Sequence, residues 1–247
     1  MCLIAFAFGV SKDYPLLFAA NRDEHYSRPT LDAEWWRDHP QILGGRDILK
    51  GGTWLGISRD GRLGAVTNLP SSSEVSNKNS RGNLVKNYLV QQRTIDQYKT
   101  RLSNDKNNYA PYNFIAFDGV KMLYSSNSNA TKLLPYGIYS ISNAPLGTSW
   151  PKVQFAETIV RSVSNSTIPE NGLFELLANS KDQKALDNLK KYDERQSRIF
   201  INNNDFGTRS STVITISREG NVQFIERNYS PDAKLINENQ YNFNLIS

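Results

Sequence analysis

Nine short segments of the sequence have the composition of β-strands, and most are joined in pairs by turns that contain glycine. The segments are residues 3–9, 16–20, 54–58, 63–68, 113–117, 121–125, 138–142, 212–217 and 221–227. The turns at 59–61, 118–119 and 218–220 end in glycine, which accepts a positive φ. Strands linked by such short turns pair as antiparallel hairpins. The βαβ alternation of dinucleotide-binding folds is not seen.

Three helical patterns interrupt the hairpins. The first follows Ser80, a candidate N-cap. Its apolar residues recur at three-, four- and seven-residue spacings and are Leu84, Tyr88, Ile95, Tyr98 and Leu102. The second pattern starts near Trp150-Pro151, with proline in the first turn, and the third runs from about Pro169 to residue 177. This order of elements predicts an α+β sandwich, in which helices cover the outer faces of stacked antiparallel sheets.

The length of 247 residues suits one large domain, and we expect a single domain over residues 1–247. Polar, turn-prone stretches at 77–79, 104–108 and 202–205 are interpreted as loops of that domain rather than as linkers. A hydrophobic fraction of 38% with 21% charged residues is sufficient for an ordered core.

No segment of the sequence has the length needed to cross a membrane. The longest apolar run, residues 3–10, is far shorter than the ~20 residues that a spanning helix requires. The N-terminal stretch has no basic start, and Lys12-Asp13 interrupts it where a signal peptide would continue. We therefore expect a cytoplasmic protein with no transmembrane segment.

The single cysteine and the dispersed positive charge argue against a disulfide-stabilised fold, a cysteine-based metal site and nucleic-acid binding. Cys2 alone cannot form an intramolecular disulfide or a cysteine-based metal cluster, and no metal site is predicted. The 29 Lys and Arg against 24 Asp and Glu give a charge of +5, but the basic residues are spread along the chain. Nucleic-acid binding needs clustered charge, so a small, anionic molecule is the more economical ligand. The oligomeric state stays open.

Cys2 is the most specific chemical feature of the sequence. A small second residue permits removal of the initiator methionine, which leaves a thiol and a free α-amine on one residue. An α-amine titrates near ~7.7–8.0 and a free thiol near ~8.5, so the two can exchange a proton and act as base and nucleophile. The alternative is that Cys2 is a small apolar residue at the start of an edge strand.

Asn21, Arg22, Asp23 and Glu24 follow the second β-segment. In a hairpin the end of the second strand lies beside the start of the first, so these polar groups are expected next to Cys2. Asp23 could then bind the α-amine, and the charge of Arg22 could lower the pKa of the thiol. Neighbouring strand residues face opposite sides, so only one of Asp23 and Glu24 should face the site. The alternative is that the four residues cap a turn.

Six motifs in this order resemble the NRDE family, which includes the transport-and-Golgi-organization proteins. The motifs are Met-Cys-Leu-Ile-Ala-Phe at 1–6, Asn-Arg-Asp-Glu within 19–29, Gly-Gly-Thr-Trp-Leu-Gly at 51–56, Ala-Val-Thr-Asn at 65–68, Ser-Asn-Ala at 142–144 and Gly-Thr-Arg-Ser-Ser-Thr at 207–212. The match spans nearly the whole chain. It implies the fold of the N-terminal-nucleophile hydrolases, a four-layer αββα sandwich, in agreement with the element order.

A more distant resemblance is to the choloylglycine hydrolase group, amidases in which an N-terminal cysteine attacks an amide bond. It implies that Cys2 is the nucleophile and Asp23 the aspartate near the α-amine. It also implies that Asn68 and Asn143 belong to the oxyanion hole and, more loosely, that Arg209 matches a late arginine of the site. The alternative for the two asparagines is that each is a turn residue shortly before a proline.

The sequence departs from these amidases at one position. Their pattern is Arg-Asn-x-Asp, and this chain has Ala20 in place of the arginine. Arg22 lies two residues further on, so by strand alternation it could project from the same face. Activation of the thiol, and with it hydrolysis, depends on whether Arg22 does so.

The resemblance implies two functions of different classes. One is an enzyme in which Cys2 attacks an amide or thioester of a small acyl substrate with no required cofactor, with Asn21, Arg22 and Asp23 beside the thiol. The other is a carrier that binds haem or acyl-CoA and related lipids without turnover. Haem would then be cargo, and Cys2, His25 and His39 are the residues able to bind its iron. Fold alone does not decide between the two.

Overall fold

The computed structural model describes residues 2–70, 78–91, 93–179 and 192–246, which form two compact units. Unit 1 contains Met1–Ser27, Tyr136–Ser142 and Leu146–Asn242, and unit 2 contains Arg28–Pro135, Asn143–Pro145 and Phe243–Ser247. Neither unit is a continuous stretch of chain. The expectation of one domain over residues 1–247 stays a prediction.

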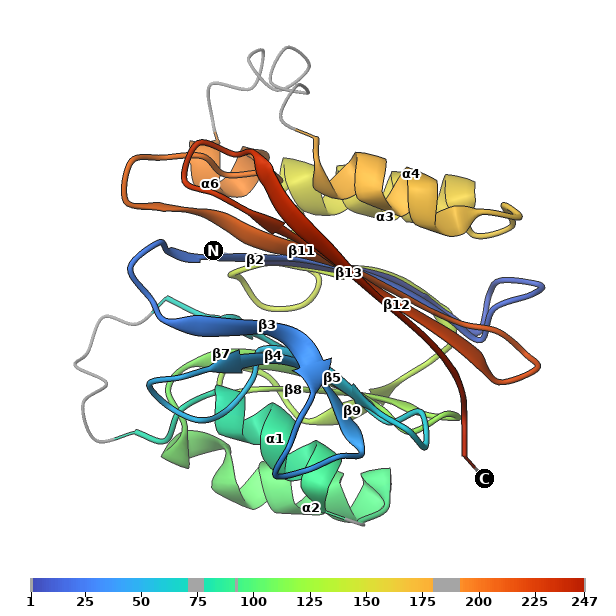
Figure 1. Cartoon of the computed structure of the whole chain (residues 1–247). Coiled ribbons are helices and arrows are strands. Elements are labelled where there is room, and N and C mark those ends of the chain that lie inside the picture. The colour runs from blue at the N-terminus through green and yellow to red at the C-terminus, as the bar shows by residue number, and fades with distance from the viewer. Residues whose placement is uncertain (1, 71–77, 92, 180–191, 247) are drawn as a thin grey trace. The chain divides into compact units, whose positions relative to one another are not determined.

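Unit 1 is built on a six-stranded sheet in the order β10-β1-β2-β11-β12-β13. The strands are β1 (Cys2–Phe8), β2 (Leu16–His25), β10 (Gly137–Ile141), β11 (Phe206–Ile216), β12 (Asn221–Tyr229) and β13 (Leu235–Asn244). The pairs β10–β1, β1–β2, β2–β11 and β11–β12 are antiparallel, and of these β1–β2 and β11–β12 are hairpins that the sequence predicts. Helices α3 (Pro151–Val163) and α4 (Pro169–Leu177) lie along one face of this sheet, and the short α6 (Glu194–Ser197) packs against α3 (Figure 1).

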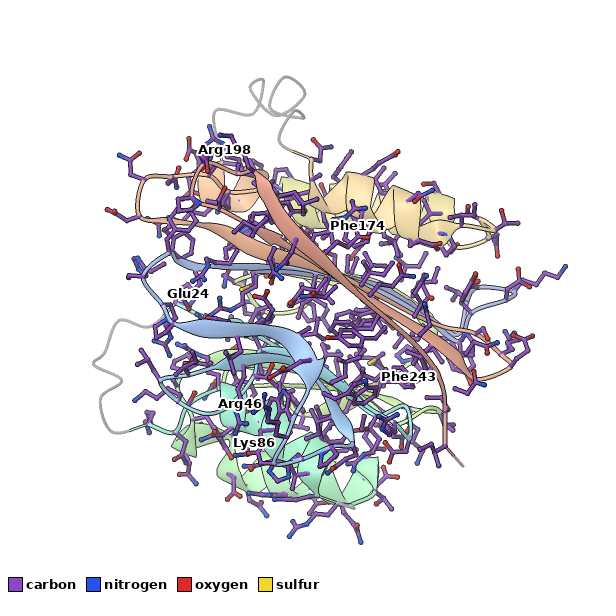
Figure 2. The ribbon with its side chains drawn as sticks, in the orientation of Figure 1. Glu24, Arg46, Lys86, Phe174, Arg198 and Phe243 are labelled. Atoms are coloured by element: carbon purple, nitrogen blue, oxygen red, sulfur yellow. The ribbon has the colours of Figure 1, made fainter. Side chains whose placement is uncertain are left out.

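The core of unit 1 lies between the sheet and helices α3 and α4. Alternate residues of β1 and β2, such as Leu3, Ala5, Leu17 and Ala19, form one apolar cluster with residues of the two helices. Phe174 extends from α4 into this cluster (Figure 2). The odd-numbered positions of β1 and β2 therefore face the helices, and the even-numbered positions face the other side of the sheet.

Both helices of this core begin at a proline, as the sequence predicts. Pro151 and Pro169 each stand in the first turn, where a missing backbone N–H costs nothing. The buried face of α3 includes Val153, Ala156 and Val160, at the three- and four-residue spacing of one helix side.

Unit 2 is built on a seven-stranded antiparallel sheet in the order β3-β4-β5-β6-β7-β8-β9. The strands are β3 (Thr30–Trp35), β4 (Ile42–Asp47), β5 (Leu55–Ser58), β6 (Leu63–Asn68), β7 (Tyr112–Phe117), β8 (Met122–Ser126) and β9 (Lys132–Leu134). Helices α1 (Gly82–Val90) and α2 (Ile95–Asp105) cover one face of it, and the 3₁₀ turn η1 (Lys106–Asn108) follows α2 (Figure 1).

Tyrosines fill the core of unit 2, and their hydroxyl groups are satisfied. Tyr88 donates to the carbonyl of Phe117 at 2.8 Å, and Tyr98 donates to the carbonyl of Leu84 at 2.8 Å. The rings of Tyr88 and Tyr98 meet edge to face with centroids 5.1 Å apart. Burial of the two hydroxyl groups therefore costs little, because each has a backbone acceptor.

The structure differs from the sequence-based expectation in several elements. The single helix expected after Ser80 is two helices, because Thr94 and Gln97 form a capping box that starts α2. Residues 104–108, expected as a loop, complete α2 and form η1. Strand β2 continues to His25 rather than ending at residue 20. Strand β11 begins at Phe206 rather than at residue 212. The strands β3, β4, β9 and β13 and the short helix α6 were not predicted. Position 77 of the expected loop at 77–79 lies outside the described residues.

Strand β4 contains two consecutive glycines, which the sequence analysis did not place in a strand. A Cβ at Gly44 would lie 2.6 Å from the backbone oxygen of Leu55, so the close approach of β5 requires glycine there. Within the described residues, no helix is long and apolar enough to span a membrane.

Candidate active site around Cys2

The register of the first hairpin brings Cys2 and Arg22 directly opposite each other. Cys2 pairs with Arg22 and Leu3 with Asn21 across β1 and β2. Both Cys2 and Arg22 stand at even-numbered positions, so their side chains belong to the sheet face that α3 and α4 do not cover. The expectation that the end of the second strand lies beside the first residues of the chain is confirmed.

The thiol of Cys2 is held among backbone groups. Its Sγ lies 3.9 Å from the backbone oxygen of Asp23, and Ser142 Oγ donates to the carbonyl of Cys2 at 2.8 Å. The residue as a whole is half-buried, but its sulfur is enclosed, and this burial raises the pKa of the thiol. The charge of Arg22 acts in the opposite direction. At neutral pH the thiol is therefore protonated and needs a base to become a nucleophile.

Asp23 is a buried carboxyl that accepts a hydrogen bond from Thr208. Thr208 Oγ1 accepts from the backbone N–H of Ile201 at 2.9 Å and donates to Asp23 Oδ1 at 2.7 Å. Burial raises the pKa of Asp23 to about 6, although the bond from Thr208 and the charges of Lys152 and Arg22 oppose the rise. Asp23 is thus mainly ionised at neutral pH and takes up a proton in mildly acidic solution.

Arg22 projects from the same face of β2 as position 20, where the amidases have an arginine and this chain has alanine. Ala20 and Arg22 share one face of β2, and Arg22 is 6% exposed and opposite Cys2. A positive charge next to the thiol and the carboxyl lowers the pKa of both groups. Arg22 therefore stands where a cation can favour the thiolate.

Asn21 faces the helices, away from the thiol. Its Nδ2 donates to the carbonyl of Leu177 at 2.9 Å and to that of Ile199 at 3.1 Å, and its Oδ1 accepts from Ser211 Oγ at 2.6 Å. These bonds connect β2 to the end of α4, to residue 199 and to β11. The geometry suits a residue that positions the hairpin rather than one that contacts a substrate.

We expect Asn21→Ala to lower the free energy of unfolding by about 3 kcal/mol, because it leaves three buried polar groups without their partner. The melting temperature should fall by roughly 6–12 °C. The exposed Asn203→Ala is the matched control and should stay within ~0.5 kcal/mol. Chemical denaturation of both variants measures the difference, and equal stabilities would contradict this role of Asn21.

Arg209 and His25 lie at the C-terminal end of β2, just beyond Arg22. A register shift between Thr208 and Ser210 makes Arg209 an extra residue of β11, and its Nη1 donates to the backbone oxygens of His25 and Tyr26 at 3.2 and 3.3 Å. The exposed ring of His25 meets Phe206 edge to face at 5.2 Å. Phe206 also lines an open hollow formed by residues 202–206, which does not include Cys2.

Asn68 and Asn143 lie together in unit 2. Asn143 Nδ2 donates to the backbone oxygen of Asn68 at 2.8 Å, and Asn68 is exposed at the end of β6. The buried Asn113 donates to Thr67 Oγ1 at 3.0 Å and to the carbonyl of Ala144 at 2.9 Å. Asn113 therefore ties residues 143–145 to the sheet of unit 2.

Three residues of these clusters escaped the sequence analysis: Thr208, Lys152 and Asn113. A polar residue within the apolar strand at 112–117 could have drawn attention to Asn113. Thr208 lies within a quoted motif but is bonded to a residue 185 positions away. Lys152 carries no local signal. Among the described residues, no group of three or more His, Cys, Asp or Glu side chains could hold a metal ion.

Comparisons with known proteins give a family and a fold. Residues 1–231 match the family model described as Transport and Golgi organisation 2. A mouse Transport and Golgi organization 2 homolog is 33% identical over 276 residues, covering 100% of both chains. A human Transport and Golgi organization protein 2 homolog is 33% identical over 259 residues, covering 92% of each.

Among solved structures, a Caenorhabditis elegans ortholog of N-acylethanolamine-hydrolyzing acid amidase aligns with a TM-score of 0.55 and 12% identity. The alignment covers 86% of this chain and 92% of that chain. Likeness at this identity shows the fold alone. The expected class, an α+β fold of antiparallel sheets and helices resembling the N-terminal-nucleophile hydrolases, is confirmed.

Proposed function

The chain belongs to the Transport and Golgi organisation 2 family, and within that family we propose that it is a hydrolase with Cys2 as its nucleophile. The substrate is a small acyl compound with a non-peptide amide or a thioester bond. The observation that carries the proposal is the cluster in which the only cysteine of the chain stands opposite buried Arg22 and beside buried Asp23. Buried charges at one end of a hairpin oppose folding, and such groups are typical of functional sites.

The chemistry begins with removal of Met1, which makes the α-amine of Cys2 available as a base. Because burial raises the pKa of the thiol, the proton must be taken by such a group before attack. The thiolate then attacks the acyl carbonyl carbon, the C–N or C–S bond breaks, and the leaving group receives the proton held by the α-ammonium. Water hydrolyses the resulting thioester, which releases the carboxylic acid and restores the thiol.

Arg22 and Asp23 have opposite electrostatic tasks in this scheme. Arg22 favours the thiolate, and ionised Asp23 favours the protonated α-amine that forms when the thiol loses its proton. Because the pKa of Asp23 is about 6, its carboxyl becomes protonated as the pH falls below that value, so we propose that turnover declines in mildly acidic solution. That Asn68 and Asn143 act as donors to the oxyanion stays a prediction of the resemblance.

The direct test is hydrolysis of a panel of N-acyl amides and acyl thioesters by the purified full-length protein, followed as release of the free acid. We expect turnover of at least one acyl class above the rate without protein, and a rate that falls as the pH drops through about 6. A panel with no member hydrolysed faster than in buffer would contradict the proposal.

A carrier function is the second candidate, and the protonated state of the thiol at neutral pH favours it. A neutral thiol suits a pocket that binds a ligand without attacking it. The relatives named above are also described by transport rather than by a reaction. The ligand would be apolar and anionic, such as haem or an acyl-CoA, and haem would be cargo rather than a cofactor.

Titration with haemin tests the carrier function. If the protein carries haem, we expect a saturable shift of the Soret band that weakens in one of His25→Ala, His39→Ala or Cys2→Ala, whichever residue binds the iron. Displacement by an acyl-CoA would place both ligands in one site. A nonsaturating, featureless titration excludes haem as the cargo.

A further inference from the structure

Lys152 is a buried lysine at an electrostatically unfavourable place. It is the second residue of α3, is 1% exposed, and has its Nζ 5.7 Å from the ring centroid of Trp150. Burial lowers the pKa of Lys152, and the N-terminus of a helix carries a partial positive charge of its own. The first turn of α3 contains no acidic residue to compensate. A cation in this place needs a partner elsewhere in the fold.

The groups that act on Lys152 are those of the candidate site. Helix α3 packs against β1 and β10, and α6 packs against α3 (Figure 1). The charge of Asp23 is the strongest attraction on Lys152, followed by Cys2 and by Asp193, the N-cap of α6. Asp23 stands at an odd-numbered position of β2, so it belongs to the face of the sheet that α3 and α4 cover. Lys152, in the first turn of α3, lies on the same side of the sheet.

We propose, on the basis of the proposed function, that Lys152 is a positioning residue that balances the charge of Asp23 and thereby leaves Arg22 to favour the thiolate of Cys2. Lys152 itself does not contact the reacting atoms. The two buried cations thus divide between the two faces of the sheet, Lys152 with the carboxylate and Arg22 with the thiol.

Without Lys152, the thiol would ionise less readily. The negative charge of Asp23 raises the pKa of Cys2, and Lys152 interacts with both groups. Asp23 is ionised at the alkaline pH where the thiol titrates, so a neutral residue at position 152 removes a positive charge from this region and leaves the charge of Asp23 in place. The pKa of the thiol should therefore rise further. Arg22, Asp193 and, on the Arg22 face of the sheet, buried Glu226 are the other charged groups of this region and remain unchanged in the experiment.

Alkylation of Cys2 by iodoacetamide measures this effect without any substrate. Because Cys2 is the only cysteine in the chain, every alkylation event reports on it. We expect Lys152→Met to move the midpoint of the rate against pH upward by about one unit, which slows alkylation about tenfold below the midpoint. Lys152→Arg should stay within about twofold of the wild-type protein. The exposed Lys12→Met, in the same unit, is the matched control and should leave the profile unchanged.

A Lys152→Met profile that superimposes on that of the wild-type protein overturns the proposal. If the variant does not fold, the same substitution is made in an Asp23→Asn background, where the carboxylate no longer needs balancing. Recovery of the fold there supports the proposal, and failure in both backgrounds marks Lys152 as purely structural and overturns it. A shifted alkylation profile in a protein that hydrolyses no acyl substrate would reject the hydrolase function while retaining the role of Lys152.

Discussion

Cys2→Ala is expected to lower hydrolysis of acyl amides and thioesters by at least about 10⁴-fold, to the rate without protein. Loss of a catalytic nucleophile removes the covalent route altogether, and the other groups of the site cannot replace it. The substitution removes one sulfur atom from a half-buried residue at the start of β1, so the fold should be retained. Steady-state rates on the substrate panel, with circular dichroism as a check on folding, measure the effect.

Cys2→Ser is the matched variant for this test. A hydroxyl occupies nearly the same space but ionises far less readily than a thiol, so a small residual rate with an unchanged fold is expected. Cys2→Ala with wild-type turnover would show that hydrolysis takes place elsewhere. If the wild-type protein binds haemin, and neither it nor Cys2→Ala nor Cys2→Ser turns over any substrate, the carrier function would be favoured.

Asp23→Asn is expected to raise the free energy of unfolding at pH 7 by up to about 3 kcal/mol while it lowers turnover. Burial raises the pKa of Asp23 from 3.8 to about 6 in the folded protein, so the folded state binds this proton more tightly than the unfolded chain does. Two pKa units correspond to about 3 kcal/mol of stability that the wild-type protein lacks above pH 6. Asparagine keeps an oxygen that can accept from Thr208 and has no charge to bury.

The pH dependence distinguishes this cause from others. As the pH falls from about 6 to 3.8, Asp23 becomes protonated in the folded state first, so its penalty disappears and the difference between the variant and the wild-type protein should vanish. Asp38 is the control of opposite sign. A bidentate bond from Arg46 lowers the pKa of Asp38 to about 2, so Asp38→Asn should destabilise slightly at pH 7.

Denaturant unfolding of the wild-type protein and both variants at pH 4.5 and pH 7 measures these differences. The expected Asp23→Asn protein is more stable and less active than the wild-type protein at pH 7. This result would separate the cost that Asp23 imposes on folding from its contribution to the site. A destabilised Asp23→Asn protein at pH 7 would show that Asp23 is a structural anchor.

The contacts that the sequence predicted well are local ones. Hairpin geometry places the end of a second strand beside the start of the first, so the proximity of Cys2 and the Asn-Arg-Asp-Glu segment follows from the turn alone. The prolines at the starts of α3 and α4 likewise act within a few residues. Such effects can be predicted from a short window of sequence.

Contacts between distant parts of the chain had no such signal. Thr208 reaches Asp23 because β11 pairs with β2, and the register shift after Thr208 decides which side chain faces the carboxyl. The sequence around Lys152 does not distinguish it from an exposed lysine, because its burial results from the packing of α3 against β1. Strand β13 is rich in asparagine and partly exposed, so its sequence lacks the apolar alternation by which the other strands were found.

The mass of the N-terminal peptide during turnover tests the central role of Cys2 most directly. Protein quenched in acid while it hydrolyses its best acyl substrate is digested and analysed by mass spectrometry. We expect a peptide that begins at Cys2 and carries one acyl group on the sulfur. Undiminished hydrolysis by protein that retains Met1, or that never carries an acyl group at Cys2, would contradict it.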